Sequence, residues 1–295
     1  MIQFIIISLF VLSLSNMFPQ NIESPESKID SIFKPLDGDF ALTFMIIGDE
    51  QSAILINEKM IFHAASTMKT PVMIEVFKQA AENKFNLDDS VYIKNEFKSI
   101  VDGSSYSLNI TDDSGEDLYT FIGKKKTIRE LVFGMISVSS NLATNILIEN
   151  VGANNIIKTM RSFGANDIKV LRGVEDDMAF QLGLNNIVTA YDLMLIYENL
   201  ANHKCVNAES SKEMINILLQ QKHNTRIPAK LPDDVKVAHK TGTITGVGHD
   251  SGIVFLPDGR KYVLVLLSKN VNDEKAVIEA QAEVSKMIYE FVVAN

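Results

Sequence analysis

Residues 40–57 read FALTFMIIGDEQSAILIN, two apolar runs on either side of a Gly-Asp-Glu turn. This pattern predicts a pair of antiparallel strands over residues 40–48 and 52–57. Strand patterns return only near the end of the chain, at residues 235–239, 252–256 and 262–267. Because an isolated two-stranded hairpin is only marginally stable in water, we expect the early pair to join the late strands in one sheet.

The long stretch between the two groups of strands has a mainly helical pattern. The tail that follows Asp273 predicts a helix with one apolar stripe that can cover the sheet, formed by Val277, Val284, Met287, Ile288 and Phe291. The predicted fold class is therefore α/β plus all-α: an antiparallel sheet flanked by helices, split in sequence around an inserted helical domain. The expected parts are a signal peptide over 1–20, an α/β domain over 21–65 plus 216–295, and an all-α domain over 66–215, with a cleft between the two domains.

The composition excludes several classes of protein. A chain of 295 residues with 46% hydrophobic and 22% charged residues can bury a sizeable core, which excludes disordered and low-complexity architectures. The net charge of −9 argues against a nucleic-acid partner, since phosphate binding needs clustered Lys and Arg. The single cysteine, Cys205, cannot form an intramolecular disulfide, and no CxxC or HExxH spacing suggests a zinc site. We therefore expect neither metal nor cofactor.

The first residues have the features of a secretory signal peptide. Residues 4–14 form an apolar run, FIIISLFVLSL, which is too short to span ~30 Å of hydrocarbon comfortably as a helix. Ser13-Leu14-Ser15 follows the small-x-small pattern that signal peptidases cleave. We expect a periplasmic or secreted, monomeric protein with no membrane anchor after signal removal. An N-terminal anchor that stays in place is the alternative, because no Lys or Arg precedes Lys28.

The segment Ser66-Thr67-Met68-Lys69 opens a helical pattern that continues to about Ala80. Lys69 falls on the apolar face of this helix, one turn from Ser66, where a solvated lysine would not normally lie. Desolvation lowers the pKa of a lysine and lets its amine activate a neighbouring hydroxyl. The spacing therefore favours Ser66 as a nucleophile and Lys69 as its base. The alternative is a lysine whose amine reaches solvent past the helix end.

Two further polar motifs could carry chemistry. Ser139-Ser140-Asn141 lies between two helical patterns, where a Ser-x-Asn sequence is also typical of a simple helix cap. Lys240-Thr241-Gly242 ends a strand-rich stretch. A lysine there can bind a carboxylate, and the glycine lets a substrate approach the strand edge. A strand that merely leaves the sheet into a loop is the plain alternative.

In this order and at this spacing, the three motifs resemble those of class A β-lactamases and penicillin-binding proteins. The surrounding segments FHAASTMKTPV, SVSSNLATNIL and HKTGTITG are similar to the family's, and the resemblance extends from about residue 40 to the end of the chain. It implies the split fold described above, acylation of Ser66, and Lys69 as the group that takes or relays its proton.

The resemblance also implies roles for the other motif residues. Ser139 would pass a proton to the departing nitrogen, and Asn141 would bind Lys69 and the substrate's side-chain amide. The substrate carboxylate would bind Lys240 and Thr241. Gly242, the third residue of this substrate-binding motif, would let the substrate approach the strand. The backbone N–H groups of Ser66 and Thr243 would form the oxyanion hole, already oriented toward the charge that develops on the carbonyl oxygen.

Two positions depart from the family's pattern. Ser140 stands where the family has an aspartate, so the motif must be stabilised by other contacts. In the loop from Arg172, the family has a glutamate followed four residues later by asparagine, whereas Ala179 stands four residues after Glu175. Glu175 is the candidate base for hydrolysis of the acyl-serine. Its rivals are the two residues that follow, Asp176 and Asp177, and in the alternative interpretation Glu175 pairs with Arg172 and only shapes the loop.

The function implied is that of a secreted serine β-lactamase, which hydrolyses the β-lactam amide of a small-molecule substrate through an acyl-serine intermediate. The alternatives are a penicillin-binding D,D-peptidase or related serine esterase, and a β-lactam-binding sensor that stays acylated. The chain has no Gly-x-Ser-x-Gly elbow, which argues against an α/β-hydrolase. Because acylation is common to the enzyme and the sensor, only turnover separates them.

Overall fold

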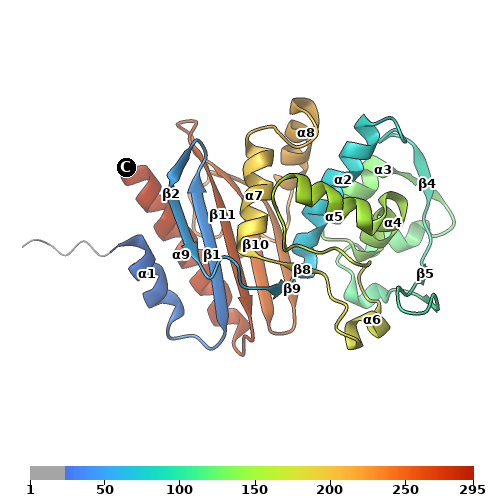
Figure 1. Ribbon diagram of the computed structural model, residues 1–295, viewed down its shortest axis with the longest axis horizontal. Coiled ribbons are helices and arrows are strands. Elements are labelled where there is room, and N and C mark those ends of the chain that lie inside the picture. The colour runs from blue at the N-terminus through green and yellow to red at the C-terminus, as the bar shows by residue number, and fades with distance from the viewer. Residues whose placement is uncertain (1–23) are drawn as a thin grey trace, which may run out of the picture.

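The computed structural model describes residues 24–295 (Figure 1), so the predicted signal peptide lies outside the described residues. The helices are α1 Pro25–Phe33, α2 Lys69–Ala81, α3 Ile128–Ser137, α4 Asn141–Val151, α5 Ala153–Ser162, α6 Asp177–Gln181, α7 Ala190–Ala201, α8 Ala208–Leu218 and α9 Glu274–Ala294. Short 3-10 helices are η1 Ala65–Met68, η2 Ile110–Asp112 and η3 Glu116–Phe121. Within the described range, no helix is long and apolar enough to cross a membrane.

The strands belong to one five-stranded sheet and three small two-stranded ones. The main sheet contains β1 Asp39–Ile46, β2 Asp49–Ile56, β9 Lys236–Ile244, β10 Val247–Phe255 and β11 Lys261–Lys269. Their order is β2-β1-β11-β10-β9 and every neighbouring pair is antiparallel. The two-stranded sheets pair β3 Phe62–His63 with β8 Ile187–Val188, β4 Ser90–Tyr92 with β7 Lys125–Thr127, and β5 Phe97–Lys98 with β6 Ser105–Tyr106. The early strands join the late ones, and the predicted fold class is confirmed.

Helices cover both faces of the main sheet. On the outer face, α1 and α9 pack against each other (Figure 1), and the predicted apolar stripe of α9 buries Val277, Val284 and Ile288. Asp273 caps α9 by accepting a hydrogen bond from the Ala276 N–H at 2.9 Å. The opposite face packs against α7, which belongs to the helical part of the chain. The exact division of the chain into domains at residues 65 and 216 stays a prediction.

Strands β9 and β10 are longer than their apolar patterns predict. The sequence indicated strands over 235–239 and 252–256, whereas the structure extends the first to Ile244 and begins the second at Val247. The pattern fails because this hairpin buries polar residues: His249, Asp250 and Ser251 are fully buried and hydrogen-bonded. As a result, the Lys-Thr-Gly motif lies within an edge strand of the main sheet rather than at the end of a strand.

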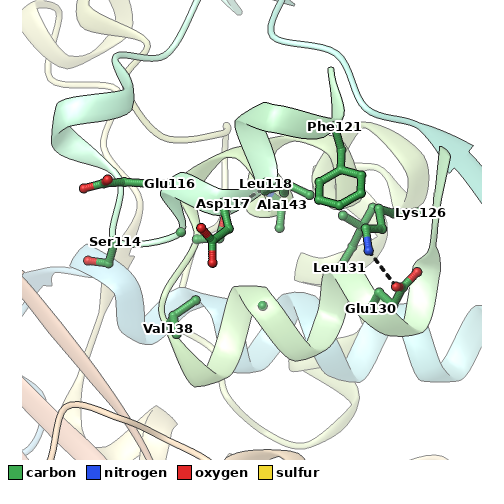
Figure 2. A pocket seen from close by; sticks show the side chains of 13 residues that line it. Ser114, Glu116, Asp117, Leu118, Phe121, Lys126, Glu130, Leu131, Val138 and Ala143 are labelled. Atoms are coloured by element: carbon green, nitrogen blue, oxygen red, sulfur yellow. Dashed lines mark hydrogen bonds and ion pairs between the residues drawn. The ribbon is translucent and has the colours of Figure 1, made fainter. Parts of the chain in front are cut away.

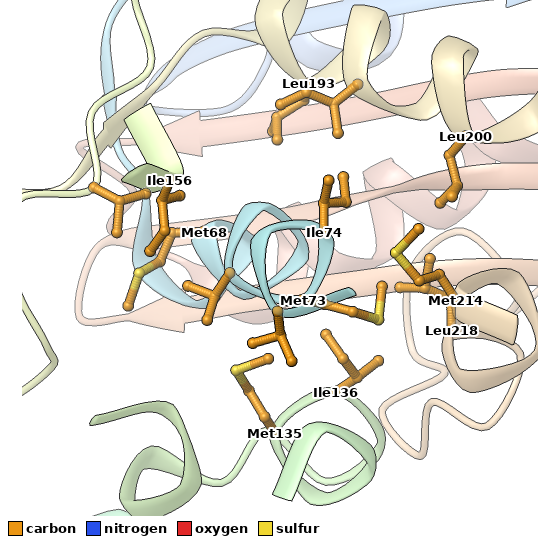
Figure 3. Close-up of a cluster of buried hydrophobic side chains, with 14 of the residues drawn as sticks. Met68, Met73, Ile74, Met135, Ile136, Ile156, Leu193, Leu200, Met214 and Leu218 are labelled. Atoms are coloured by element: carbon orange, nitrogen blue, oxygen red, sulfur yellow. The ribbon is translucent and has the colours of Figure 1, made fainter. Parts of the chain in front are cut away.

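The core of the helical part surrounds helix α2 (Figure 3). Methionine, isoleucine and leucine side chains from α3, α7 and α8 pack against it, among them Met135, Ile136, Leu193, Leu200, Met214 and Leu218. Every residue from Lys69 to Phe77 is buried, so α2 is enclosed on all sides rather than on a single face. A close-packed interior is hardly compressible, so the start of the helix has a fixed position against the sheet.

Candidate active site

Ser66 lies on a tightly held turn between the main sheet and helix α2. The preceding residue, Ala65, has φ of +44°, a left-handed conformation that is strained for a residue with a side chain. Its N–H donates to His63 Nδ1 at 3.0 Å. Strand β9 passes so close that a Cβ added at Gly242 would lie 3.0 Å from the backbone nitrogen of Ser66. Glycine is therefore required at this crossing.

A cleft of about 250 Å³ opens beside Ser66. Its lining residues are Ser66, Asp112, Ser114, Ser139, Asn141, His223, Thr225, Arg226, Thr241 and Thr243. Five of the predicted site residues therefore line one cavity: Ser66, Ser139, Asn141, Thr241 and Thr243. The other four predicted residues, Lys69, Glu175, Lys240 and Gly242, are not part of its lining. Both backbone groups predicted for the oxyanion hole, those of Ser66 and Thr243, belong to residues of this lining. Across residues 24–295, no group of three or more His, Cys, Asp or Glu residues could hold a metal ion.

The two motif lysines meet at one hydroxyl group. Lys69 Nζ lies 2.7 Å from the Ser139 carbonyl oxygen, 3.1 Å from Ser139 Oγ and 2.9 Å from Asn141 Oδ1. Lys240 Nζ lies 3.0 Å from the same Ser139 Oγ and 2.9 Å from the Thr241 carbonyl oxygen. If Lys240 donates to Ser139 Oγ, the hydroxyl proton can point at the lone pair of a neutral Lys69. Ser139 is therefore placed to carry a proton between the cleft and the lysines.

Burial changes the protonation of both lysines. Lys69 and Lys240 are each 0% exposed. Burial lowers the pKa of Lys69 to about 7, against the opposing effects of the Asp113 and Glu175 carboxylates. Burial, followed by repulsion from Lys69, also lowers the pKa of Lys240 well below its usual value. The interpretation in which Lys69 reaches solvent is wrong, and its amine can be neutral near pH 7.

The pKa of Lys69 predicts how acylation depends on pH. Only the neutral amine can take a proton from Ser66, so the acylation rate constant should rise with pH and level off above about 7. Below that midpoint it should fall by about tenfold per pH unit, as expected for one titrating base. Single-turnover acylation by a β-lactam, measured between pH 5 and 9, tests this. A rate that is flat from pH 5 to 7 would show that Lys69 is not the base.

Glu175 faces the same network from the loop that precedes α6. Its Oε1 accepts from Asn141 Nδ2 at 2.9 Å, and its Oε2 accepts from the Asn109 N–H at 3.1 Å. Asn141 therefore links Glu175 to Lys69. Burial raises the pKa of Glu175, which brings its carboxylate closer to the basicity that a catalytic base needs. Glu175 has φ of +60°, so its backbone is held in a strained conformation.

The two rival aspartates are placed differently. Asp176 is buried, caps α6 through the Ala179 N–H at 3.2 Å, and accepts from the Ser99 hydroxyl at 2.9 Å. Asp177 is exposed on the first turn of α6. Neither of them lines the cleft or bonds to the lysine network. The geometry therefore favours Glu175 over its neighbours.

Arg172 stabilises the loop without pairing with Glu175. Its guanidinium donates to the carbonyl oxygens of Leu184 and Gly173 at 3.0 Å each, and to Asn185 Oδ1 at 3.3 Å. No ion pair joins Arg172 to Glu175 in the described part of the chain. The alternative in which Glu175 serves only to neutralise Arg172 has no geometric support.

Two asparagines that the sequence reasoning missed fix this loop to the site. Asn145 on α4 accepts from the Val174 N–H at 2.7 Å and donates to the Val174 carbonyl at 3.0 Å. A Cβ at Gly173 would lie 2.4 Å from Asn145 Oδ1, so the loop needs glycine there. Asn186 donates to the sulfur of Met68, which belongs to the same short helix η1 as Ser66, at 3.4 Å. No local sequence signal distinguishes these asparagines from ordinary loop residues.

Arg226 is a further cleft residue that the sequence reasoning missed. It lies 14 residues before Lys240, is 5% exposed, and its Nε is buried without a hydrogen-bond partner among the described residues. Burial lowers its pKa, with the Asp250 carboxylate opposing that effect. A guanidinium is charged throughout the physiological range, so Arg226 adds a cation to the lining of the cleft.

The structure is thus an antiparallel sheet flanked by helices, and its cleft is lined by Ser66, Ser139 and Asn141. Two buried lysines and a loop glutamate are joined to Ser139 and Asn141 by hydrogen bonds. A family model described as β-lactamase enzyme family matches residues 24–292. The chain therefore belongs to the β-lactamase enzyme family, and the predicted family resemblance is confirmed.

Individual relatives agree with that assignment. A β-lactamase of Bacteroides uniformis is 27% identical over 303 residues, covering 97% of each chain. The crystal structure of a β-lactamase from Sphaerobacter thermophilus superposes with a TM-score of 0.77 at 24% identity, covering 92% of this chain and 97% of that one. A PBP-A mutant, solved as an acyl-enzyme complex with penicillin G, gives 0.77 at 22% identity, covering 92% and 97%. At these identities the solved structures establish the fold.

Proposed function

We propose that this protein is an exported serine β-lactamase of the class A type, which hydrolyses β-lactams through an acyl-serine on Ser66. The family supports β-lactam hydrolysis, and the single observation that carries the mechanism is the lysine network. A fully buried Lys69 with a pKa of about 7 lies one helical turn from Ser66 and shares the Ser139 hydroxyl with Lys240. A structural lysine would be placed where its ammonium is solvated or paired with a carboxylate.

In the proposed acylation step, Ser66 Oγ attacks the carbonyl carbon of the β-lactam ring while Lys69 takes its proton. The C–N bond of the ring then breaks, and Ser139 passes a proton to the departing nitrogen and recovers one from the lysines. The backbone N–H groups of Ser66 and Thr243 stabilise the oxyanion. Preorganised donors of this kind contribute about 3 kcal/mol each, by the cost of removing one.

The proposed deacylation step uses Glu175. The carboxylate would take a proton from a water molecule, whose oxygen attacks the ester carbonyl carbon. As the bond from that carbon to Ser66 Oγ breaks, the proton passes to Ser66 Oγ, which restores the serine hydroxyl and the Glu175 carboxylate and releases the ring-opened product. Its hydrogen bonds to Asn141 and the Asn109 N–H hold the carboxylate beside the network that made the ester. A positioned general base contributes about 10² to 10⁴ in rate.

The charges around the cleft suit an anionic substrate. Arg226 and Thr241 line the cleft, so the carboxylate that β-lactams carry would meet a cation and a hydroxyl group there. A neutral ester would leave the buried Arg226 without a partner, which favours the lactam over a simple esterase substrate.

One observation favours a second candidate, a penicillin-binding protein that turns over slowly. Ala179 replaces the asparagine that the family has four residues after the glutamate, so one polar group that would position the water is missing. Purified protein mixed with a large molar excess of a chromogenic cephalosporin separates the two. The proposed function requires many substrate molecules hydrolysed per protein molecule, whereas one equivalent followed by arrest indicates the slow-turnover candidate.

The proposal of export rests on the apolar run over residues 4–14 and can be tested separately. N-terminal sequencing of protein recovered from the periplasm or the medium should begin between about residues 16 and 22, because signal peptidases cut after the apolar segment. An intact Met1 on such material would contradict export while leaving the proposed chemistry unaffected.

A further inference from the structure

We propose that Asp113 is a positioning residue for the acylation step. It lies in the segment between η2 and η3, and its carboxylate anchors the turn Ser139–Leu142. In the family an aspartate stands within this turn, at the position that Ser140 occupies here. This inference rests on the proposed function, since it concerns the same acyl transfer to Ser66. It accounts for the serine at position 140, which the family resemblance alone leaves unexplained.

The contacts of Asp113 are concentrated on that turn. The side chain is 2% exposed. Its Oδ1 accepts from the Asn141 N–H at 2.9 Å and from the Gly115 N–H at 2.8 Å. Its Oδ2 accepts from the Leu142 N–H at 2.8 Å and from the Ser140 hydroxyl at 3.4 Å. Three of these four donors belong to the turn that carries the catalytic Ser139.

Asp113 binds backbone groups that have no other partner among residues 24–295. Asn141 and Leu142 are the first two residues of α4, and N–H groups at these positions have no acceptor within their own helix. A carboxylate there also interacts favourably with the positive end of the helix dipole. Ser140 completes the arrangement, because its Oγ accepts from the Ala143 N–H at 3.3 Å.

Close packing fixes the residue at position 115, two residues after Asp113. A Cβ added at Gly115 would lie 2.4 Å from Ser140 Cβ and 2.6 Å from Ser140 Oγ. Only glycine therefore fits at position 115 while its N–H donates to Asp113 and Ser140 lies beside it.

The turn that Asp113 anchors also holds the lysine network. Ser139 has φ of +63°, so the backbone before α4 is strained and needs external support. Asn141, whose N–H bonds to Asp113, contacts Lys69 through Oδ1 at 2.9 Å and Glu175 through Nδ2 at 2.9 Å. Loss of the carboxylate would release the segment that places all three groups.

Asp113 also acts on Lys69 through its charge. The charged and titratable groups that face Lys69 are Asp113, Glu175, Lys240 and, farther away, His223. Burial lowers the pKa of Lys69, and Asp113 is the largest opposing influence. Removing its charge should therefore lower the pKa of Lys69 further and move the acidic limb of the acylation profile to lower pH.

The chain supplies a matched control in the same segment. Asp117, on η3, directs its side chain toward a neighbouring pocket of about 430 Å³ (Figure 2). Its carboxylate makes no hydrogen bond or ion pair with the described residues. Asp117→Asn removes the same charge as Asp113→Asn without touching the turn.

The test compares Asp113→Asn, Asp117→Asn and the wild type for acylation by a fluorescent penicillin, at a temperature where urea titration shows all three to be folded. Asp113→Asn should acylate at least about tenfold more slowly, because misplaced catalytic groups cost one to two orders of magnitude. The fall of its acylation rate at acidic pH should also begin at a lower pH than in the wild type. Asp117→Asn should match the wild type in both the rate and its pH dependence. If Asp113→Asn acylates at the wild-type rate and with the wild-type pH dependence, the proposal is overturned.

A second measurement uses the wild type alone and needs no β-lactam. Because Asp113 is the only acceptor of the Asn141 and Leu142 N–H groups in the part of the chain that the structure describes, their hydrogen exchange reports on this anchor. We expect both amides to exchange at least about 100-fold more slowly than amides in exposed loops. Exchange at loop rates would overturn the anchor even if Asp113→Asn failed to fold. If the wild type never forms an adduct, the proposed function fails, and amide exchange alone decides whether Asp113 holds the turn.

Discussion

Replacing Ser66 with alanine should abolish the covalent adduct with β-lactams and lower hydrolysis by about 10⁴-fold or more, the scale on which serine hydrolases depend on their nucleophile. The fold should be preserved, because the Ser66 side chain is only partly buried and its hydroxyl makes no hydrogen bond with the described residues. Intact-mass measurement after mixing with a slowly hydrolysed β-lactam gives the first readout, and steady-state hydrolysis gives the second.

The chain contains its own control for this experiment. Ser31 stands three residues before Lys34 in a second Ser-x-x-Lys sequence, but it lies exposed on α1 and donates to the Lys28 carbonyl at 2.7 Å. Ser31→Ala should acylate and turn over like the wild type. Labelling of Ser66→Ala at the wild-type rate would show that another residue is the nucleophile.

Replacing Glu175 with glutamine should separate the two halves of the reaction. Acylation should stay nearly intact, because Gln keeps an acceptor for the Asn109 N–H or Asn141 Nδ2. Deacylation should slow by at least about 10²-fold, since glutamine cannot take a proton from water. The acyl-serine should therefore accumulate and be visible as a persistent mass increase equal to the whole substrate.

Asp177→Asn is the matched control, because it neutralises an exposed carboxylate two residues away that does not line the cleft. It should turn over at the wild-type rate. Glu175→Gln that releases product as fast as the wild type would assign Glu175 a structural role only. The group that hydrolyses the ester would then have to lie elsewhere around the cleft.

The elements with a regular local pattern could be predicted from the sequence. Residues 40–47 are strongly apolar without alternation, as buried strands are, and β1 is buried along most of its length. The second predicted strand is present as β2, which begins at Asp49 within the predicted turn and is mostly exposed or half-buried. The apolar stripe of α9 and its Asp273 cap are likewise visible in the sequence. Ser66 and Lys69 could be singled out because a lysine on an apolar helical face conflicts with its surroundings.

What could not be predicted depends on contacts between distant segments. Asp113 bonds to residues 27 to 29 positions away, and nothing near it marks it as more than a loop aspartate. Arg226 reaches the cleft from a loop without a regular pattern. The full lengths of β9 and β10 could not be predicted either, because both strands contain buried polar residues such as His249 and Asp250. Buried polar groups that are hydrogen-bonded leave no hydrophobic pattern in the sequence.

The central claim is that an ester on Ser66 forms and is then hydrolysed by this same site. A time course of intact-mass spectra of the wild type, with tenfold excess of a slowly hydrolysed cephalosporin and peptide mapping at each point, tests it most directly. We expect an adduct on the peptide that contains Ser66, and this adduct should disappear once the substrate is consumed and leave unmodified protein. Hydrolysis without any adduct at Ser66, or an adduct that persists after the substrate is exhausted, would contradict it.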